Sequence, residues 1–269
     1  MPPKRKARKP ADAIDLTEMA SPQEKKQKVA LTTIAKEFIC PITQELPIKP
    51  VTAEDGKIYE ETAIREWFST KDVPTSPSTG AVIGAKLLPA PQARNTIEAL
   101  VHSGAIAGEI AEAWTKKLEQ EKNVKEIRAK AEGGDGEAMY LLGAWYEYGE
   151  KGLAEDMVQA RAWYERSAAT RNPRGLAVFG ESLLLGEGGP QDNVFGIMNL
   201  TQAAELGSVM GASILGEAFF KGTDGLPKDP VRARYWLKKI ADGESEVKDL
   251  DDADLAVAAE WLRQLDQEA

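Results

Sequence analysis

The stretch that decides the first fold of this chain covers residues 38–68 and reads FICPITQELPIKPVTAEDGKIYEETAIREWF. Asp55-Gly56 marks a tight turn, and apolar β-forming residues on either side predict two short strands around Val51 and Tyr59. From Glu60 to Ser69 the apolar residues recur at helical spacing. The stretch therefore predicts a small domain in which a hairpin is followed by a helix.

Further anchors continue this pattern toward the C-terminus. They are Pro77-Ser78-Thr79 on a second loop, Leu87-Leu88-Pro89, and the apolar positions Ile97, Leu100 and Val101 of a closing helix over 95–102. In this order the anchors resemble the U-box family, a RING-like fold that recruits ubiquitin-conjugating enzymes without a metal. The resemblance covers residues 36–103 and implies a small α+β domain over residues 34–104.

The composition argues against a zinc-bound variant of this fold. A structural zinc ion takes four thiolate or imidazole ligands, and the whole chain holds one cysteine, Cys40, and one histidine, His102. We expect no metal and no cofactor. Cys40 lies among apolar neighbours, so we interpret it as a buried packing residue. His102 is expected at the surface, near the end of a helix.

The resemblance implies a function for the two loops and the helix. Ile42 on the first loop, Trp67 on the helix and Pro77 on the second loop would form a shallow apolar groove for a conjugating enzyme loaded with ubiquitin, flanked by Ile39 and Gln44. Such a ligase acts by proximity and orientation and forms no covalent intermediate of its own. For Trp67, core packing is the alternative interpretation. No residue is predicted to be catalytic.

Three positions depart from the family pattern. Lys49 replaces an acidic residue and Glu61 replaces a basic one, so we hypothesise that their side chains pair with exchanged polarity. Gly80 occupies the position where a basic side chain can clamp ubiquitin against the conjugating enzyme. This predicts a ligase of modest intrinsic activity. The alternative is a catalytically weak scaffold or adaptor protein with a degenerate U-box.

Residues 105–130 are expected to form a linker helix. Ile106, Ile110, Trp114 and Leu118 recur every fourth residue and form an apolar stripe. We expect the stripe to pack on a neighbouring helix, with self-association as the alternative.

Residues 131–243 repeat with a period of 36 or 37 residues. The recurring positions include Leu142-Gly143, Phe179-Gly180 and Leu215-Gly216, and also Asp156, Asp192 and Asp229. This period predicts an all-α solenoid, and the pattern resembles Sel-one-like repeats, which are related to tetratricopeptide repeats. The resemblance implies a surface that binds a protein substrate or adaptor.

Two further features concern the ends and alignment of the repeats. The second repeat carries Met198-Asn199 where we align Trp163-Tyr164 of the first repeat and Tyr235-Trp236 of the third. These aromatic residues are expected to pack between helices. Residues 244–269 are expected to supply a capping helix.

Residues 1–33 are interpreted as a disordered basic tail. The run Lys4, Arg5, Lys6, Arg8 and Lys9 predicts nuclear import and a nuclear or nucleocytoplasmic location, with a solvated tail as the alternative. Ile14-Asp15-Leu16 is a candidate for weak SUMO contact. The net charge of −9 argues against nucleic acid as a partner, and no apolar run has the length of a membrane span.

Overall fold

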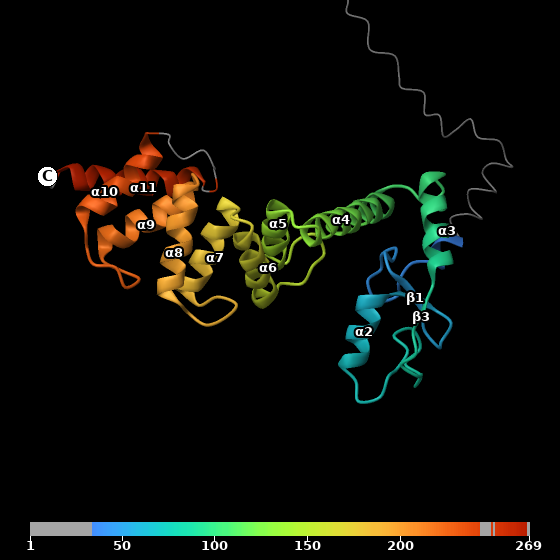
Figure 1. Cartoon of the computed structure of the whole chain (residues 1–269). Helices are drawn as coiled ribbons and strands as arrows, with labels where there is room; N and C mark the ends of the chain where they lie inside the picture. The colour runs from blue at the N-terminus through green and yellow to red at the C-terminus, as the bar shows by residue number, and fades with distance from the viewer. Residues whose placement is uncertain (1–33, 243–248, 250, 268–269) are drawn as a thin grey trace, which may run out of the picture. The chain divides into compact units, whose positions relative to one another are not determined.

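The computed structural model describes residues 34–242, 249 and 251–267 (Figure 1). The basic run from Lys4 to Lys9 and the candidate segment Ile14-Asp15-Leu16 lie outside the described residues. The described residues form two compact units that divide after Leu118, and we describe them separately. In the described part, no helix is both long and apolar enough to cross a membrane.

The first unit is built on a three-stranded antiparallel sheet of order β2-β1-β3. The strands are β1 (Pro50–Thr52), β2 (Ile58–Glu60) and β3 (Leu88–Pro89), and the helices are α2 (Glu61–Ser69), α3 (Pro91–His102) and the start of α4 (Glu109–Glu132). The predicted hairpin and helix are confirmed, and Gly56 supplies the turn with a φ of +74°. The closing helix begins earlier than predicted, because Pro91 suits a first helical position.

Two apolar clusters form the core of this unit. One lies on the sheet and contains Cys40, Val51, Ala53, Tyr59 and Ile64. Cys40 is completely buried, which confirms its predicted packing role. His102 is exposed at the end of α3, as predicted. The other cluster joins the first loop to α3 and α4 and contains Leu46, Ile48, Ile97, Leu100, Ile106, Trp114 and Leu118.

The beginning of α4 belongs to this second cluster. Of the predicted stripe, Ile106, Trp114 and Leu118 are buried, whereas Ile110 is 42% exposed. The indole nitrogen of Trp114 donates to the carbonyl oxygen of Pro47 at 3.1 Å. The prediction that the stripe packs on a neighbouring helix is therefore confirmed for three residues. These residues also cover the first loop, through Leu46 and Ile48. A fragment that ended at residue 105 would expose this cluster.

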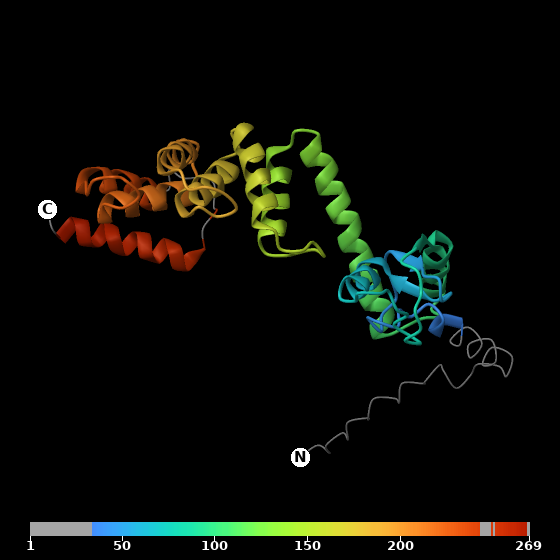
Figure 2. The same ribbon diagram turned by 90° about the horizontal axis from the view of Figure 1, so that it is seen from below.

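The second unit is a right-to-left array of helix pairs in Figure 1, closed by one further helix. The helices are α5 (Gly136–Glu147), α6 (Met157–Ala169), α7 (Pro173–Leu185), α8 (Asn193–Glu205), α9 (Val209–Lys221), α10 (Pro230–Ala241) and α11 (Asp252–Gln267). α11 packs against α9 and α10 (Figure 2). The predicted solenoid and its capping helix are both present.

The recurring glycines let paired helices approach closely. A Cβ atom on Gly143 would lie 2.5 Å from Tyr164, one on Gly180 would lie 2.8 Å from Leu200, and one on Gly216 would lie 2.7 Å from Leu237. The facing residue thus stands 20 or 21 positions later in each repeat. These distances are below van der Waals contact, so only glycine fits without a shift of its neighbour.

The recurring aspartates begin the second helix of each repeat. Asp156, Asp192 and Asp229 are the N-cap residues of α6, α8 and α10, and each side chain accepts a hydrogen bond from a backbone N–H of the first turn. An N-cap carboxylate satisfies donors that the helix itself cannot pair. The period noticed in the sequence therefore marks a repeated helix start.

The alignment of Trp163-Tyr164 with the other two pairs was wrong by one residue, whereas Met198-Asn199 and Tyr235-Trp236 were aligned correctly. The facing glycines make Tyr164, Leu200 and Leu237 equivalent, which in turn aligns Trp163 with Asn199 and Trp236. Trp163, Asn199 and Trp236 are buried, as this alignment requires, whereas Tyr235 is 54% exposed. The predicted inter-helix packing holds for Trp163, Tyr164 and Trp236 but is wrong for Tyr235. The error arose because α6 and α10 each carry two adjacent aromatic residues, which can be aligned pair to pair although they occupy different positions of the repeat.

We predict that Gly216→Ala destabilises the second unit by about 1–3 kcal/mol, because the added methyl overlaps the side chain of Leu237. In a Leu237→Ala background the same change should cost much less, since its three nearest atoms all belong to Leu237. Urea unfolding followed by circular dichroism measures both effects. Equal costs in the two backgrounds would show that Leu237 is not the obstacle.

Candidate functional site

The three predicted groove residues lie on the elements expected for them. Ile42 is half-buried on the first loop, Trp67 is half-buried on α2, and Pro77 is half-buried on the second loop. Ile42 and Trp67 pack against the same cluster on the sheet. Part of each side chain is therefore fixed by the core, and part stays accessible.

The Trp67 ring is held from two directions. Its indole nitrogen donates to the Thr75 carbonyl oxygen at 2.9 Å, and the Lys71 ammonium lies 4.7 Å from the centre of a Trp67 ring. The first contact ties α2 to the second loop, and the second is a cation–π contact. Core packing and surface presentation, which the sequence left as alternatives, are thus both features of this residue.

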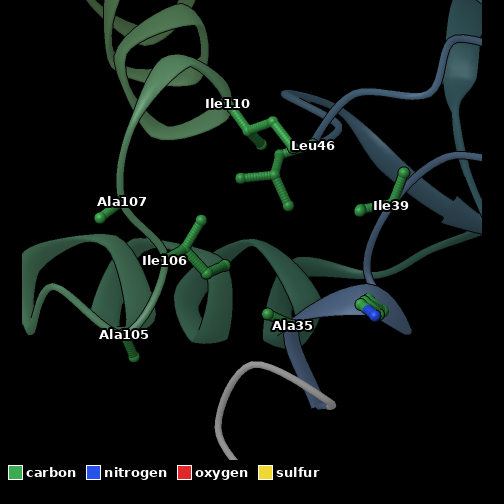
Figure 3. A pocket seen from close by; sticks show the side chains of 8 residues that line it. Ala35, Ile39, Leu46, Ala105, Ile106, Ala107 and Ile110 are labelled. Carbon is green, nitrogen blue, oxygen red and sulfur yellow. The ribbon is translucent and has the colours of Figure 1, made fainter. Parts of the chain in front are cut away.

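The two flanking residues lie in different surroundings. Gln44 is exposed with a φ of +58°, and its side-chain amide donates to the Pro41 carbonyl oxygen at 2.8 Å. Ile39 packs against the second cluster and lines an apolar pocket of about 190 Å³ with Leu46, Ile106 and Ile110 (Figure 3). The structure therefore does not bring Ile39 into the cluster that holds Ile42 and Trp67.

One carboxylate, that of Asp55, holds the second loop to the hairpin. Its Oδ2 accepts hydrogen bonds from Tyr59 Oη at 2.7 Å and from Ser76 Oγ at 2.6 Å, and its Oδ1 accepts from the Lys57 amide at 3.0 Å. Tyr59 Oη also lies 2.9 Å from Ser78 Oγ. Sequence reasoning recognised Asp55 only as a turn residue, because a short motif does not show which loop folds back over the turn.

The protonation of Asp55 reflects this setting. Burial on its own would raise the pKa of the carboxyl group, but the hydrogen bonds from Ser76, from the Lys57 amide and from Tyr59 favour the charged form and hold the pKa below its usual value. Burial raises the pKa of Tyr59, and the neighbouring Asp55 carboxylate adds to the increase. Tyr59 therefore stays protonated and donates to a charged acceptor.

A second carboxylate, that of Glu60, holds the first loop. Its Oε2 accepts from the Ile48 amide at 2.6 Å and from the Lys49 amide at 3.2 Å. Arg94 on α3 donates to the Ile48 carbonyl oxygen at 3.0 Å. The loop that carries Ile42 is thus fixed by hydrogen bonds to side chains from β2 and α3.

The hypothesis of a Lys49–Glu61 side-chain pair is not supported. The Glu61 carboxylate accepts two hydrogen bonds from Arg65, one turn further along α2. The link to Lys49 is instead a backbone hydrogen bond, from the Glu61 N–H to the Lys49 carbonyl oxygen at 3.0 Å. An acidic residue in the first turn of a helix finds a partner four residues later on the same helix, which is a local contact.

Gly80 lies at the tip of the second loop. Its φ is +73°, and a Cβ atom there would meet nothing within 4 Å. Its N–H donates to the Ser76 carbonyl oxygen at 2.9 Å. A side chain at this position would have free space but would strain the backbone. Among the residues that the structure describes, no group of three or more His, Cys, Asp or Glu could hold a metal ion.

The repeats carry a separate acidic cluster. Burial and the nearby carboxylates of Glu187, Glu147 and Asp254 raise the pKa of Glu181 on α7 to about 7. Tyr164 donates a hydrogen bond to Glu147 within the same region. Glu181 therefore titrates near neutral pH.

Comparison with protein families agrees with the geometry of both units. The family description for the U-box domain matches residues 34–104, and that for the Sel1 repeat matches residues 136–169, 175–208 and 210–245. This chain carries a U-box domain followed by three Sel1 repeats. Among U-box proteins, residues of this chain are 46% identical over 63 residues to the human "WD repeat, SAM and U-box domain-containing protein 1".

A second relative is the Medicago truncatula protein named "Putative E3 ubiquitin-protein ligase LIN", with 44% identity over 54 residues. The match to the human relative covers 23% of this chain and 13% of that protein. The match to the plant relative covers 20% of this chain and 4% of that protein. The chain thus spans a small part of the curated relatives that it matches.

Two solved structures match part of this chain. A Sel1 repeat protein from Oxalobacter formigenes is 31% identical, with a TM-score of 0.41, and the match covers 44% of this chain and 89% of that one. The c5321 antigen of uropathogenic Escherichia coli, which displays an SLR fold, is 24% identical, with a TM-score of 0.42 and coverage of 66% and 38%.

We predict that Asp55→Asn lowers the free energy of unfolding of the U-box by about 1–3 kcal/mol at neutral pH, because charged hydrogen bonds are lost. The folded-state pKa of Asp55 is depressed, so its contribution is present above the unfolded pKa of about 3.9 and is lost as the pH falls through the folded pKa. The difference between variant and wild type should therefore shrink in acid.

Urea unfolding at neutral and acidic pH, followed through backbone NMR signals of β1 and β2, tests this expectation. Asp72→Asn is the control for the loss of a carboxylate, because Asp72 is exposed on the second loop. A cost that stays constant down to acidic pH would contradict the role given to the Asp55 charge.

Proposed function

We propose that this chain is a ubiquitin-protein ligase that recruits a ubiquitin-loaded conjugating enzyme through its U-box. One observation carries the proposal: the chain has a U-box domain in which Ile42, Trp67 and Pro77 are each partly exposed. They lie on two loops and a helix that hydrogen bonds hold together. The name of the Medicago truncatula relative supports the same activity. Ile39 and Gln44 are proposed to flank the contact.

The proposed mechanism places the ubiquitin thioester on the conjugating enzyme throughout. Cys40 is the only cysteine of the chain and is completely buried, so the ligase has no accessible thiol to accept ubiquitin. Its contribution is to hold the loaded enzyme near a substrate lysine, which raises the effective concentration of the two reactants. No covalent intermediate on the ligase is required.

The Sel1 repeats are proposed to bind the substrate or an adaptor. Stacked helix pairs present an extended surface, and such arrays commonly bind proteins. Nuclear import through Lys4, Arg5, Lys6, Arg8 and Lys9, and weak SUMO contact at Ile14-Asp15-Leu16, are additional proposals that rest on the sequence.

The alternative function is that of a repeat scaffold whose U-box is catalytically weak. Gly80 favours this alternative, because glycine offers no side chain to restrain ubiquitin at that position. The two functions differ in a measurable way: a ligase stimulates transfer from at least one conjugating enzyme, and a pure scaffold stimulates none.

We predict that the full chain accelerates discharge of ubiquitin from a conjugating enzyme onto free lysine, and that Ile42→Ala slows this discharge about tenfold, because a few apolar anchors supply most of the recruitment energy. Val257→Ala removes an exposed apolar side chain of α11, outside the U-box, and should have no effect. Thioester discharge with a panel of conjugating enzymes, in the presence of a chelator, measures the rates. Equal slowing by both variants would place the groove elsewhere.

We predict that Gly80→Arg speeds discharge while leaving the affinity for the conjugating enzyme unchanged. A charge-assisted hydrogen bond to ubiquitin would form only in the attack-ready arrangement. Gly80→Ala is the matched control, because it imposes the same left-handed backbone strain of about 1–2 kcal/mol without the charge. Single-turnover discharge and titration calorimetry separate the two effects.

Arginine and alanine variants that behave alike would reject a clamp at this position. A chain that promotes no discharge from any conjugating enzyme, even with the arginine present, would favour the scaffold alternative.

A further inference from the structure

The second helix of the middle repeat, α8, exposes an unusual group of apolar side chains. Val194 is 75% exposed and Met198 is 60% exposed, and Phe195 beside them is 44% exposed. Met198 follows Val194 by four positions and Phe195 by three, so on the helix surface it neighbours both side chains. Large apolar side chains that gather on one face of a soluble protein mark an interaction surface more often than isolated ones do.

The face around these residues is also uncharged. From Asn193 to Ala204, α8 contains no Asp, Glu, Lys or Arg. Covering it would remove apolar surface from water without stripping water from a charge. Depletion of charge together with Met and aromatic residues is the composition of the centre of a protein–protein interface.

The neighbouring repeats extend this face at equivalent positions. Val158 on α6 and Val231 on α10 correspond to Val194, and both are at least 65% exposed. Tyr235 on α10 corresponds to Met198 and is also exposed. We call these six residues the apolar ridge: Val158, Val194, Phe195, Met198, Val231 and Tyr235.

The ridge has a basic border on one side. On α10, Lys238 is exposed, and the Lys239 ammonium lies 5.7 Å from the Tyr235 ring. On α6, Arg166 stacks on Trp163 at 4.0 Å, with the acidic Glu165 beside it. Within the described part of the chain, no ion pair involves Lys238, Lys239 or Arg166. The positive charge is therefore concentrated on α10, in a chain whose net charge is −9.

We propose that the apolar ridge is the docking surface for a partner protein, and that the partner presents aliphatic or aromatic side chains to α8 and acidic side chains to α10. The charge complementarity identifies the chemistry of this partner. A basic segment would gain apolar contacts but would meet Lys238 and Lys239 with like charge. The inference rests on the proposed role of the repeats in protein binding, and it specifies the surface and the partner.

Selection of a displayed library of random peptides on the purified full chain tests the proposal. Selected peptides are expected to combine two or more large apolar residues with neighbouring Asp or Glu. A synthetic peptide of the selected consensus should bind at least about tenfold more weakly to the Val194→Ser/Met198→Ser variant. Both side chains are exposed, so the variant should retain the fold.

Two further variants complete the test. Lys238→Glu should weaken the same peptide about threefold, and added salt should reduce the difference. Val257→Ser changes an exposed apolar residue of α11 and should leave binding unchanged. Selected peptides without acidic residues, or equal affinity for wild type and the double variant, would overturn the proposal.

Self-association is the competing outcome. If sedimentation shows that the wild-type chain dimerises and that Val194→Ser/Met198→Ser abolishes the dimer, the ridge is an interface between copies and the proposal is wrong. Ubiquitin discharge onto free lysine, measured on the same variants, should stay at the wild-type rate. Loss of peptide binding with normal discharge separates this inference from the proposed ligase activity, and absence of discharge with normal peptide binding would reject only the latter.

Discussion

The loops of the first unit are held in place by two carboxylates, and each carboxylate accepts several hydrogen bonds. Asp55 joins the hairpin to the second loop through Ser76, and Glu60 fixes the first loop through the Ile48 amide. A zinc-bound relative would hold the corresponding loops by coordination bonds. Here each loop is held by charge-assisted hydrogen bonds, which are stronger than neutral ones but require an ionised acceptor. The positions of Ile42, Trp67 and Pro77 follow from this arrangement, because all three lie on or beside the tethered loops.

The repeats solve a similar problem by a different physical means. Adjacent helices are aligned by the close fit of a glycine against a large side chain, as at Gly143 and Tyr164. Each second helix starts at a capping aspartate such as Asp192. Packing and capping are local to each repeat, so the array is specified unit by unit. This leaves the solvent-facing positions of the second helices free to vary, which is where Met198 and Tyr235 lie.

Much of this arrangement was predictable from the sequence, and the failures share a cause. The turn at Gly56, the amphipathic helix α2 and the repeat period rest on local patterns, and these were correct. The alignment that paired Tyr235 with Trp163 failed because a period detects similar residues and not the facing partner. The partners of Asp55 and the surroundings of Ile39 were missed because they come from segments distant in sequence. Periodicity shows that a face is apolar but not which surface covers it.

The hydrogen bond between Trp114 and Pro47 gives the structure a thermodynamic link that runs in both directions. The first loop is complete only when the start of α4 is folded against it, since Trp114 and Leu118 close the cluster that contains Leu46. A ligand that orders this loop must therefore stabilise the folded state of the beginning of α4. By reciprocity, unfolding of this part of α4 must lower the affinity for the ligand by the same coupling free energy. The beginning of α4 therefore belongs to the structure that fixes the first loop.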